Sequence, residues 1–229
     1  MKYLLIIPAR GGSKGIPKKN ITELNGIPLI EYTIKAAHKV ISEKECIQAI
    51  VSTDNEEIRR VAINAGADVP FLRPAGMSED RSSSLDYILH AIEFFSNNNV
   101  EIQNIIILQP TSPLRNANDI ISAIDLYESE KSNCLISVYE EHTVNSKIIY
   151  KQKGKFGYPV DNAHNFGQRR QDEEPILVRN GAIYITNVHF LRTESTIISN
   201  KPLVYIMPKY RSINIDTYDD LSLATKMLS

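Results

Sequence analysis

Short apolar runs alternate with longer segments of mixed polarity through the first 140 residues of the chain. The runs are residues 3–7 (YLLII), 47–53 (IQAIVST), 105–108 (IIIL) and 134–139 (CLISVY). Continuous apolar runs of this length are typical of strands that are buried on both faces of a sheet. Because strands and helical segments alternate, the pattern predicts an α/β fold with a mostly parallel, Rossmann-like sheet and helices on both faces.

The segments between these strands carry helix-start signals. A helix is expected after each of the following: Pro28 before residues 29–40, Asp54 or Asn55 before 56–65, the serines at 82–84 before 85–95, and Asn118 or Asp119 before 120–129. Proline suits a first helical position, and the short polar side chains can accept hydrogen bonds from the first helical N–H groups. Further on, GAIYIT and PLVYIM read as strands, and residues 217–228 read as an amphipathic closing helix.

The alternation stops after Tyr139. Residues 140–177 are polar and contain only short alternating pieces such as KIIYK and KFGYPV, which predict a hairpin arm. A two-stranded hairpin buries too little surface to be stable by itself, so we expect it to contact a partner subunit or to fold over the site. The sequence therefore predicts a single domain over residues 1–229 with an inserted dimerisation arm at about 140–177.

Composition narrows the class of protein. The 229 residues are 42% hydrophobic and 23% charged, which is enough for a sizeable core, and the formal net charge of -1 gives no reason to expect nucleic acid or a membrane as a partner. Cys46 and Cys134 lie in apolar stretches without metal-ligand spacing, and we expect buried, reduced thiols. Pro8 and Arg10 interrupt the first apolar run before it reaches signal-peptide length, so a cytoplasmic location is expected.

The strongest chemical signal is residues 6–20, IIPARGGSKGIPKKN, where cations and glycines gather without an acid. Ligands of parallel sheets bind beyond the carboxyl ends of the strands, and glycines allow backbone N–H groups to approach an anion closely. The spacing is neither a Walker A motif nor G-x-G-x-x-G, which excludes the ordinary ATPase and dehydrogenase classes. We interpret this basic loop as an anion-binding site; a solvated basic loop is the alternative.

The segment PARGGSKGIPKKNI resembles the amino-terminal signature of the cytidylyltransferases that activate acidic keto-sugars, especially the acylneuraminate group, also called CMP-sialic acid synthetases. Further segments similar to that family follow in order: LNGIPLIEYTI, IVSTDNEEI, FLRPAGMSED, ILQPTSPLR, RRQD, NGAIYI and INIDTYDDL. The resemblance spans nearly the whole chain. It implies a homodimer with the nucleotide-diphospho-sugar transferase type of fold.

The resemblance also implies an activity and its substrates. CMP would pass from CTP to the anomeric hydroxyl of a nine-carbon 2-keto acid, with release of pyrophosphate and with Mg²⁺ as cofactor. The acceptor would be an N-acylneuraminate or a related nonulosonate such as legionaminate or pseudaminate. A 3-deoxy-octulosonate cytidylyltransferase, another sugar nucleotidyltransferase and a catalytically silent nucleotide-binding regulator are the alternatives.

Site residues follow from chemistry and from the resemblance together. A triphosphate requires cations, and a guanidinium can contact two phosphate oxygens at once, so Arg10 is the candidate for the charge that develops in the transition state. The resemblance implies a nucleotide-binding set of Arg10, Gly11, Lys14, Lys19, Asn20, Arg73 and Ser83. It implies a sugar-binding set of Gln109, Lys147, Arg170, Gln171 and Tyr184, with Lys147, Arg170 and Gln171 reaching over from the neighbouring subunit.

Several of these residues have a plainer interpretation. Arg73 taken alone could be a surface arginine, and an aromatic residue such as Tyr184 on a strand usually belongs to the core. Lys18 is expected to face solvent. The residues after Gln109, namely Thr111, Ser112 and Arg115, are expected to do no more than cap and begin the following helix.

The motif INIDT carries the expected metal ligands. The resembled family has two aspartates separated by one residue, whereas this chain has Asn214 and Asp216. Side chains alternate along an extended segment, so both lie on one face. Asp216 supplies a carboxylate and Asn214 only a neutral oxygen, but one carboxylate suffices for Mg²⁺, which keeps waters and binds phosphate oxygens. The catalytic set is then Arg10, Gln109 and Asp216; a helix cap before Tyr218 is the plainer role for Asp216.

Overall fold

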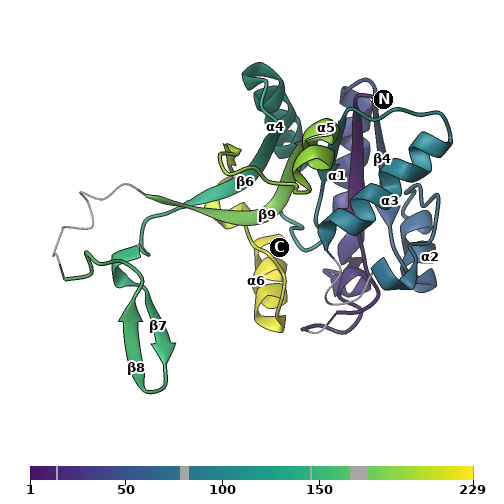
Figure 1. Cartoon of the computed structure of the whole chain (residues 1–229). Helices are drawn as coiled ribbons and strands as arrows, with labels where there is room; N and C mark the ends of the chain where they lie inside the picture. The colour runs from purple at the N-terminus through teal and green to yellow at the C-terminus, as the bar shows by residue number, and fades with distance from the viewer. Residues whose placement is uncertain (14, 78–82, 145, 166–174, 229) are drawn as a thin grey trace.

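The computed structural model describes residues 1–13, 15–77, 83–144, 146–165 and 175–228 (Figure 1). Its centre is a six-stranded sheet in the order β10-β6-β9-β5-β1-β4. The strands are β1 (Tyr3–Pro8), β4 (Ile47–Ser52), β5 (Asn104–Ile107), β6 (Cys134–Glu141), β9 (Ile176–Asn187) and β10 (Leu203–Ile206). β1 runs parallel to β4 and β5, β10 runs parallel to β6, and β9 lies antiparallel between β5 and β6. The mostly parallel sheet is confirmed.

Helices cover both faces of this sheet, as the apolar runs predicted. α1 (Leu29–Glu43), α2 (Glu56–Asn64) and α4 (Ala117–Glu130) contribute to one core, and α3 (Ser84–Asn97) and α5 (Val188–Glu194) contribute to the other. Within β1, Leu5 and Ile7 join the first core while Leu4 and Ile6 join the second. Successive side chains on a strand point to opposite faces, so a run that is apolar throughout can fill both layers.

A third, smaller core lies under the carboxyl edge of the sheet. It joins Ile16 of the basic loop to Leu24, Leu29, Ile215 and Ala224. Apart from Ile16, these residues come from the short strand β2 (Glu23–Leu24), the start of α1, the INIDT segment and α6 (Tyr218–Leu228). β2 pairs with the short strand β3 (Ile27–Pro28). The burial of the core residues places the basic loop and the INIDT segment side by side, although they are far apart in the sequence.

The start of α2 agrees with the sequence prediction, and the start of α4 does not. Asn55 caps α2, because its side-chain oxygen accepts hydrogen bonds from the backbone N–H groups of Glu57 and Ile58. α4 begins earlier than predicted, since Asn116 is the cap and Asp119 lies inside the first turn. Asn116 and Asp119 bond reciprocally to each other's backbone N–H groups, which is the capping-box arrangement.

The hairpin predicted between residues 140 and 177 forms as β7 (Tyr150–Lys153) and β8 (Phe156–Pro159), after the short 3-10 helix η3 (Ser146–Ile148). It projects away from the body of the molecule beyond the long ends of β6 and β9 (Figure 1). Every residue of β7 and β8 is exposed. Among the described residues, no helix has the length and apolar character needed to cross a bilayer.

The two cysteines differ from each other, and the prediction for Cys46 is wrong. Cys134, at the start of β6, is buried, and its Sγ lies 3.2 Å from Ser199 Oγ. Cys46 is exposed, with φ of 59° in the turn between α1 and β4. Cys46 directly precedes β4 (Ile47–Ser52), so it adjoins the apolar residues of the strand but lies in the turn, where it faces solvent. Both thiols are free.

Candidate active site

A cavity of about 980 Å³ opens at the carboxyl ends of the parallel strands, where the fold predicts a ligand. The basic loop, the chain after β5, part of β9 and the INIDT segment form its walls. The predicted site residues that line it are Arg10, Lys19, Asn20, Arg73, Ser83, Gln109, Tyr184, Asn214 and Asp216. Side chains from widely separated parts of the sequence therefore converge on one volume.

Other predicted residues lie elsewhere. Gly11 is in the basic loop, where its backbone N–H donates to Asp54 Oδ1 at 2.8 Å, rather than on the cavity lining of the described chain. Lys147 belongs to η3 in the arm and does not reach the described cavity of its own chain. Lys14, Arg170 and Gln171 lie outside the described residues.

The basic loop is held close to its neighbours by tight backbone contacts. Asn20 is only 6% exposed, and its Nδ2 donates to the carbonyl oxygen of Arg10 at 3.0 Å. A Cβ at Gly15 would lie 2.3 Å from the carbonyl oxygen of Asp216, so only glycine allows this approach. Lys18 is exposed, as expected, and pairs with Glu57 at 2.6 Å. Gly15 is thus required by the packing of the loop, whether or not a ligand is bound.

Arg73 is buried against a tyrosine ring rather than lying on the surface. It is 5% exposed, and its Nη2 and Nε donate to the backbone oxygen and Oγ of Ser52 at 2.5 and 3.3 Å. Its guanidinium carbon lies 4.8 Å from the ring centroid of Tyr87. Desolvation is the main cause that lowers the pKa of Arg73. A buried cation that lines a cavity suits a ligand with acceptor atoms.

Ser83 caps α3 and is exposed at the cavity wall. Its backbone N–H donates to Asp86 Oδ2 at 2.8 Å, which completes a capping box. Ser83 can both cap α3 and line the cavity. The positive end of the α3 dipole then lies at the cavity wall, where it favours a negatively charged ligand.

The chain after β5 is fixed by Arg115, for which the sequence interpretation was wrong. Arg115 does not merely begin α4: it is 2% exposed and extends into the core. Its Nη2 donates to Thr33 Oγ1 at 2.8 Å and its Nη1 to the backbone oxygen of Ala182 at 3.1 Å. Burial lowers the pKa of Arg115 to about 10. A buried guanidinium thereby ties the turn that carries Gln109 to α1 and β9.

β9 supplies residues that the sequence interpretation missed. The pairing of β6 with β9 shifts register between Ile136 and Val138, and Gly181 has φ of 77° at the irregularity. The irregularity places Arg179 and Asn180 on the cavity lining beside Tyr184. The Arg179 guanidinium carbon lies 6.0 Å from the Tyr184 ring centroid. Desolvation raises the pKa of Tyr184.

The INIDT segment presents its two polar side chains on one face, as predicted. Asn214 and Asp216 are exposed toward the cavity while Ile215 is fully buried between them. Asp216 Oδ1 accepts from Lys19 Nζ at 2.7 Å, and Oδ2 accepts from Asn214 Nδ2 at 2.5 Å. Asp216 is not the helix cap: Thr217 and Asp220 bond reciprocally at the start of α6.

The donor set limits which cation could bind. Among the described residues there is no group of three or more histidine, cysteine, aspartate or glutamate side chains that could hold a metal ion. Asp216 and Asn214 fit Mg²⁺, which retains waters and takes phosphate oxygens, better than a cation that requires a full protein cage. The residues present are therefore compatible with the Mg²⁺ that the sequence predicts.

Comparison with solved structures defines the fold class. The chain superposes on CMP:2-keto-3-deoxy-manno-octonic acid synthetase in complex with CTP with a TM-score of 0.71 at 15% identity, covering 100% of this chain and 98% of that one. It also superposes on 4-diphosphocytidyl-2C-methyl-D-erythritol synthase from Anaerococcus prevotii, with a TM-score of 0.64 at 13% identity and coverage of 99% and 98%. At these identities the likeness establishes the fold alone, which is the nucleotide-sugar transferase type.

Residues 4–220 match the family model described as cytidylyltransferase, and the chain belongs to this family. It is 33% identical to a pseudaminic acid cytidylyltransferase of Campylobacter jejuni, over 98% of this chain and 95% of that protein. It is 32% identical to a CMP-N,N'-diacetyllegionaminic acid synthase of Legionella pneumophila, over 100% and 97%. It is 35% identical to an N-acylneuraminate cytidylyltransferase of Streptococcus agalactiae, of which it spans about half, 52%.

Proposed function

We propose that the protein transfers CMP from CTP to the anomeric hydroxyl of a nine-carbon 2-keto acid sugar and releases pyrophosphate. The convergence of Arg10, Lys19 and Asp216 on one cavity carries the proposal, because cations and a carboxylate side by side suit a metal-bound triphosphate. The names of relatives that match over almost their whole length support a nonulosonate acceptor.

In the proposed reaction the anomeric oxygen of the sugar attacks the α-phosphorus of CTP. A new oxygen–phosphorus bond forms, the bond from the α-phosphorus to the bridging oxygen breaks, and the hydroxyl proton is released to solvent. Mg²⁺, held at Asp216 with Asn214 beside it, would neutralise phosphate charge. Arg10 and Lys19 bind phosphate oxygens, and Arg10 stabilises the charge that grows in the transition state.

The remaining residues bind and orient the two substrates. Arg73 and Ser83 receive the cytidine part, and Gly11, Lys14 and Asn20 belong to the same nucleotide-binding loop. Gln109 can both donate to and accept from a sugar hydroxyl or carboxylate, and Tyr184 adds an aromatic wall to that part of the cavity. Arg179, which lies on the same wall, adds a cation suited to an acidic acceptor.

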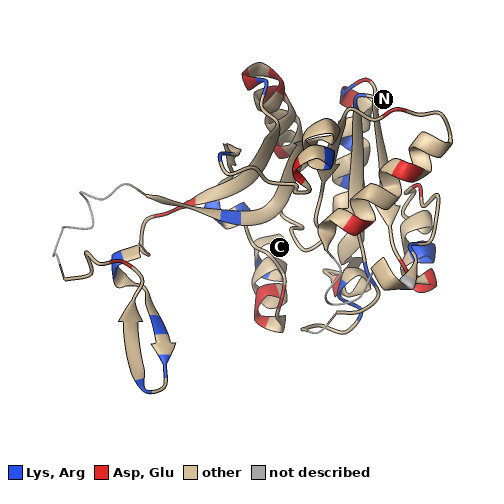
Figure 2. Cartoon of the chain, viewed as in Figure 1, with Lys and Arg blue, Asp and Glu red and all other residues tan. Residues whose placement is uncertain are grey.

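We also propose a cytoplasmic homodimer in which the arm contacts the second subunit. Phe156 is 73% exposed and Tyr150 and Tyr158 are each 51% exposed, which is a large apolar area for a free hairpin. β7 contains two lysines and β8 contains no charged residue, and the ribbon of both strands has no acidic colouring in Figure 2. Lys147, Arg170 and Gln171 would then approach the acidic sugar in the neighbour's cavity.

A substrate panel tests the activity. Pyrophosphate release is measured for four nucleoside triphosphates, each with N-acetylneuraminate, a legionaminate, a pseudaminate and 3-deoxy-octulosonate. We expect release only with CTP and a nine-carbon acid. Pyrophosphate release with the octulosonate alone would show that an eight-carbon acid is the acceptor. CTP binding without pyrophosphate release in any combination would indicate a regulator instead of an enzyme.

A further inference from the structure

The chain between β10 and α6 brings the proposed metal ligands to the cavity. After the 3-10 helix η5 (Lys209–Arg211), residues 212–217 contain no strand or helix. We call residues 208–216 the ligand segment. Without regular backbone pairing, the positions of Asn214 and Asp216 depend on the contacts that fix this segment to the rest of the fold.

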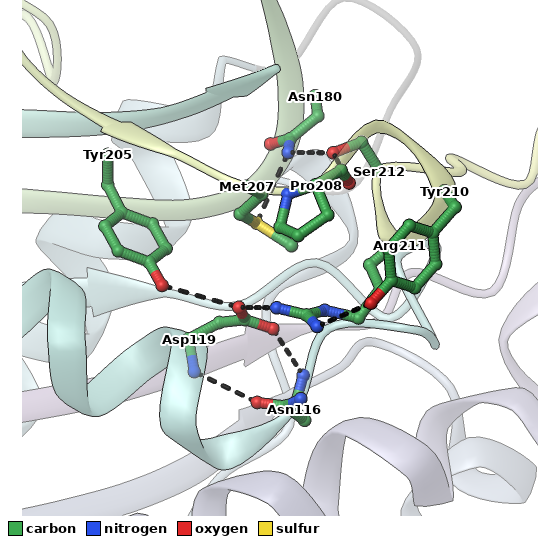
Figure 3. A network of polar contacts seen from close by, with 9 residues as sticks. All are labelled: Asn116, Asp119, Asn180, Tyr205, Met207, Pro208, Tyr210, Arg211 and Ser212. Atoms are coloured by element: carbon green, nitrogen blue, oxygen red, sulfur yellow. Dashed lines mark hydrogen bonds and ion pairs between the residues drawn. The ribbon is translucent and has the colours of Figure 1, made fainter. Parts of the chain in front are cut away.

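An ion pair fixes the entrance of the ligand segment (Figure 3). Arg211 Nη2 lies 2.6 Å from Asp119 Oδ1, and the Asp119 side chain is only 1% exposed. The other oxygen of Asp119 accepts from the backbone N–H of Asn116 at 3.0 Å, inside the capping box of α4. The carboxylate is thus bonded to a helix start, and Arg211 binds an acceptor that cannot easily move.

Two tyrosines complete the surroundings of this pair. Tyr205 donates its hydroxyl to Asp119 Oδ1 at 3.4 Å, and Arg211 Nη1 donates to the hydroxyl of Tyr210 at 3.1 Å. Asp119 raises the pKa of Arg211 by hydrogen bonding and by its charge, against the lowering effect of desolvation, which is the largest single cause. The Arg211 guanidinium is therefore charged at neutral pH.

Besides the ion pairs of Lys209 with Glu141 and of Asp216 with Lys19, the ligand segment has two weaker anchors after Arg211. Ser212 Oγ accepts from Asn180 Nδ2 at 2.9 Å, and the backbone N–H of Ile215 donates to the backbone oxygen of Thr111 at 2.8 Å. These are neutral hydrogen bonds, whereas the contact between Arg211 and Asp119 is charge-assisted and buried on the carboxylate side. Neither Arg211 nor Asp119 lies on the cavity lining, so any effect on chemistry must pass through the segment.

We propose that Arg211 and Asp119 are a positioning pair, which holds the ligand segment where Asp216 and Asn214 can meet Mg²⁺ on the bound triphosphate. The inference rests on the proposed function. A buried ion pair gives little net stability compared with apolar side chains of similar size, so its value here is the fixed geometry it imposes. Loss of the pair weakens the Mg²⁺ contribution to nucleotide binding and leaves the metal-free binding of CTP intact.

The test uses Asp119→Asn with Arg211→Gln in one protein, because removal of a single partner would leave a buried charge unpaired. CTP affinity is measured by calorimetry in EDTA and in saturating Mg²⁺, without any sugar. For the parental protein we expect Mg²⁺ to strengthen CTP binding roughly tenfold, within the usual range of coupling between ligands. For the double variant we expect unchanged affinity in EDTA and loss of most of that gain.

The matched control is Lys44→Gln with Asp125→Asn, a pair that also joins α4 to another element but does not touch the ligand segment. This control should keep the parental Mg²⁺ gain, which is the increase in CTP affinity from EDTA to saturating Mg²⁺. A parental gain in the Asp119 and Arg211 double variant would overturn the positioning role, as would the absence of any gain in the parental protein. A parental protein that binds no CTP would instead refute the proposed function from which the inference starts.

If thermal unfolding shows that the double variant does not fold, the same CTP affinities are measured for Arg211→Lys, and the outcome for that variant decides between the alternatives. The lysine keeps a positive charge beside Asp119, but its single ammonium does not reproduce the planar guanidinium that bonds Asp119 and Tyr210 together. We expect a folded protein with a reduced Mg²⁺ gain. A folded Arg211→Lys protein with the full parental gain would overturn the proposal.

Discussion

Lys19 Nζ lies 2.7 Å from Asp216 Oδ1, so a cation of the basic loop is paired with the carboxylate of the INIDT segment on the cavity lining. The Lys19 side chain is 16% exposed and that of Asp216 is 65% exposed. An exposed pair of this kind contributes little stability. Its importance is that the carboxylate and the ammonium share one site, where a triphosphate and its metal would engage both groups.

Asp216→Asn should nearly abolish pyrophosphate release at any Mg²⁺ concentration. The substitution removes the only carboxylate of the INIDT pair and leaves Lys19 without its partner. Mg²⁺ titrations at saturating CTP and acceptor test this expectation. Near-parental turnover of the variant would place the metal site elsewhere.

Asn214→Asp should keep activity and lower the Mg²⁺ concentration needed for the half-maximal rate. A second carboxylate beside Asp216 strengthens cation binding, and the amide donor that now bonds Asp216 Oδ2 is lost. The acceptor KM is titrated separately. A raised acceptor KM with unchanged Mg²⁺ dependence would show that Asn214 contacts the sugar carboxylate instead.

Gly15→Ala should lower the thermal midpoint of unfolding in the absence of ligands. The new methyl group would lie 2.3 Å from the backbone oxygen of Asp216, so the basic loop or the INIDT segment must shift. Gly12→Ala is the matched control, because among the described residues no atom beyond its chain neighbours lies within 4 Å of a Cβ there. Equal midpoints for the two variants would mean that the loop accommodates the methyl group without strain.

The sequence predicted the framework and the convergence of the motifs, because continuous apolar runs identify buried strands and parallel strands end at one edge. It could not predict Arg115, whose charge suggests a surface position until Thr33 and Ala182 are brought to it by folding. Arg179 was missed because a register shift between β6 and β9, not a sequence period, turns it toward the cavity. The roles of residues such as Arg115 and Arg179, which depend on contacts between distant parts of the sequence, can be recognised only when the fold is known.

The arm joins the body at Glu141, which gives a pH-dependent prediction. Glu141 Oε2 accepts from Lys209 Nζ at 2.6 Å and Oε1 accepts from Thr143 Oγ1 at 2.6 Å. The hydrogen bond from Lys209, followed by those from Thr143, lowers the pKa of Glu141 from 4.5 to about 2. A carboxyl group with a lower pKa in the folded state stabilises the protein above its unfolded pKa, and this contribution is lost as the pH falls from 4.5 toward 2.

Glu141→Gln should therefore reduce stability at neutral pH and flatten the acid limb of the stability curve. Denaturant unfolding at several pH values between neutrality and acid measures both effects. Glu140→Gln is the control, since Glu140 is the exposed neighbour on the same strand. An acid limb as steep in Glu141→Gln as in the parental protein would show that other carboxylates account for it.

Arg10→Ala should lower kcat by roughly 100-fold, the scale for loss of one charge-stabilising donor. The CTP dissociation constant, measured directly, should change much less, because a contact that strengthens as charge develops acts on the rate. Arg59→Ala on α2 serves as the control, since Arg59 pairs with Glu56 and neither residue lines the cavity. An unchanged kcat would remove Arg10 from the catalytic set.

Two inactive variants should complement each other if the arm acts across a two-fold interface. In a mixed dimer of Arg10→Ala with an arm variant carrying Lys147→Ala and Arg170→Ala, one cavity has both an intact loop and an intact arm. Random association makes half of the dimers mixed, so co-expression should restore about one quarter of the parental activity. Lys155→Ala, at the hairpin tip, is the control that should be active alone. If each arm served its own cavity, the mixed dimers would contain no intact site, and activity would stay at the sum of the separate variants.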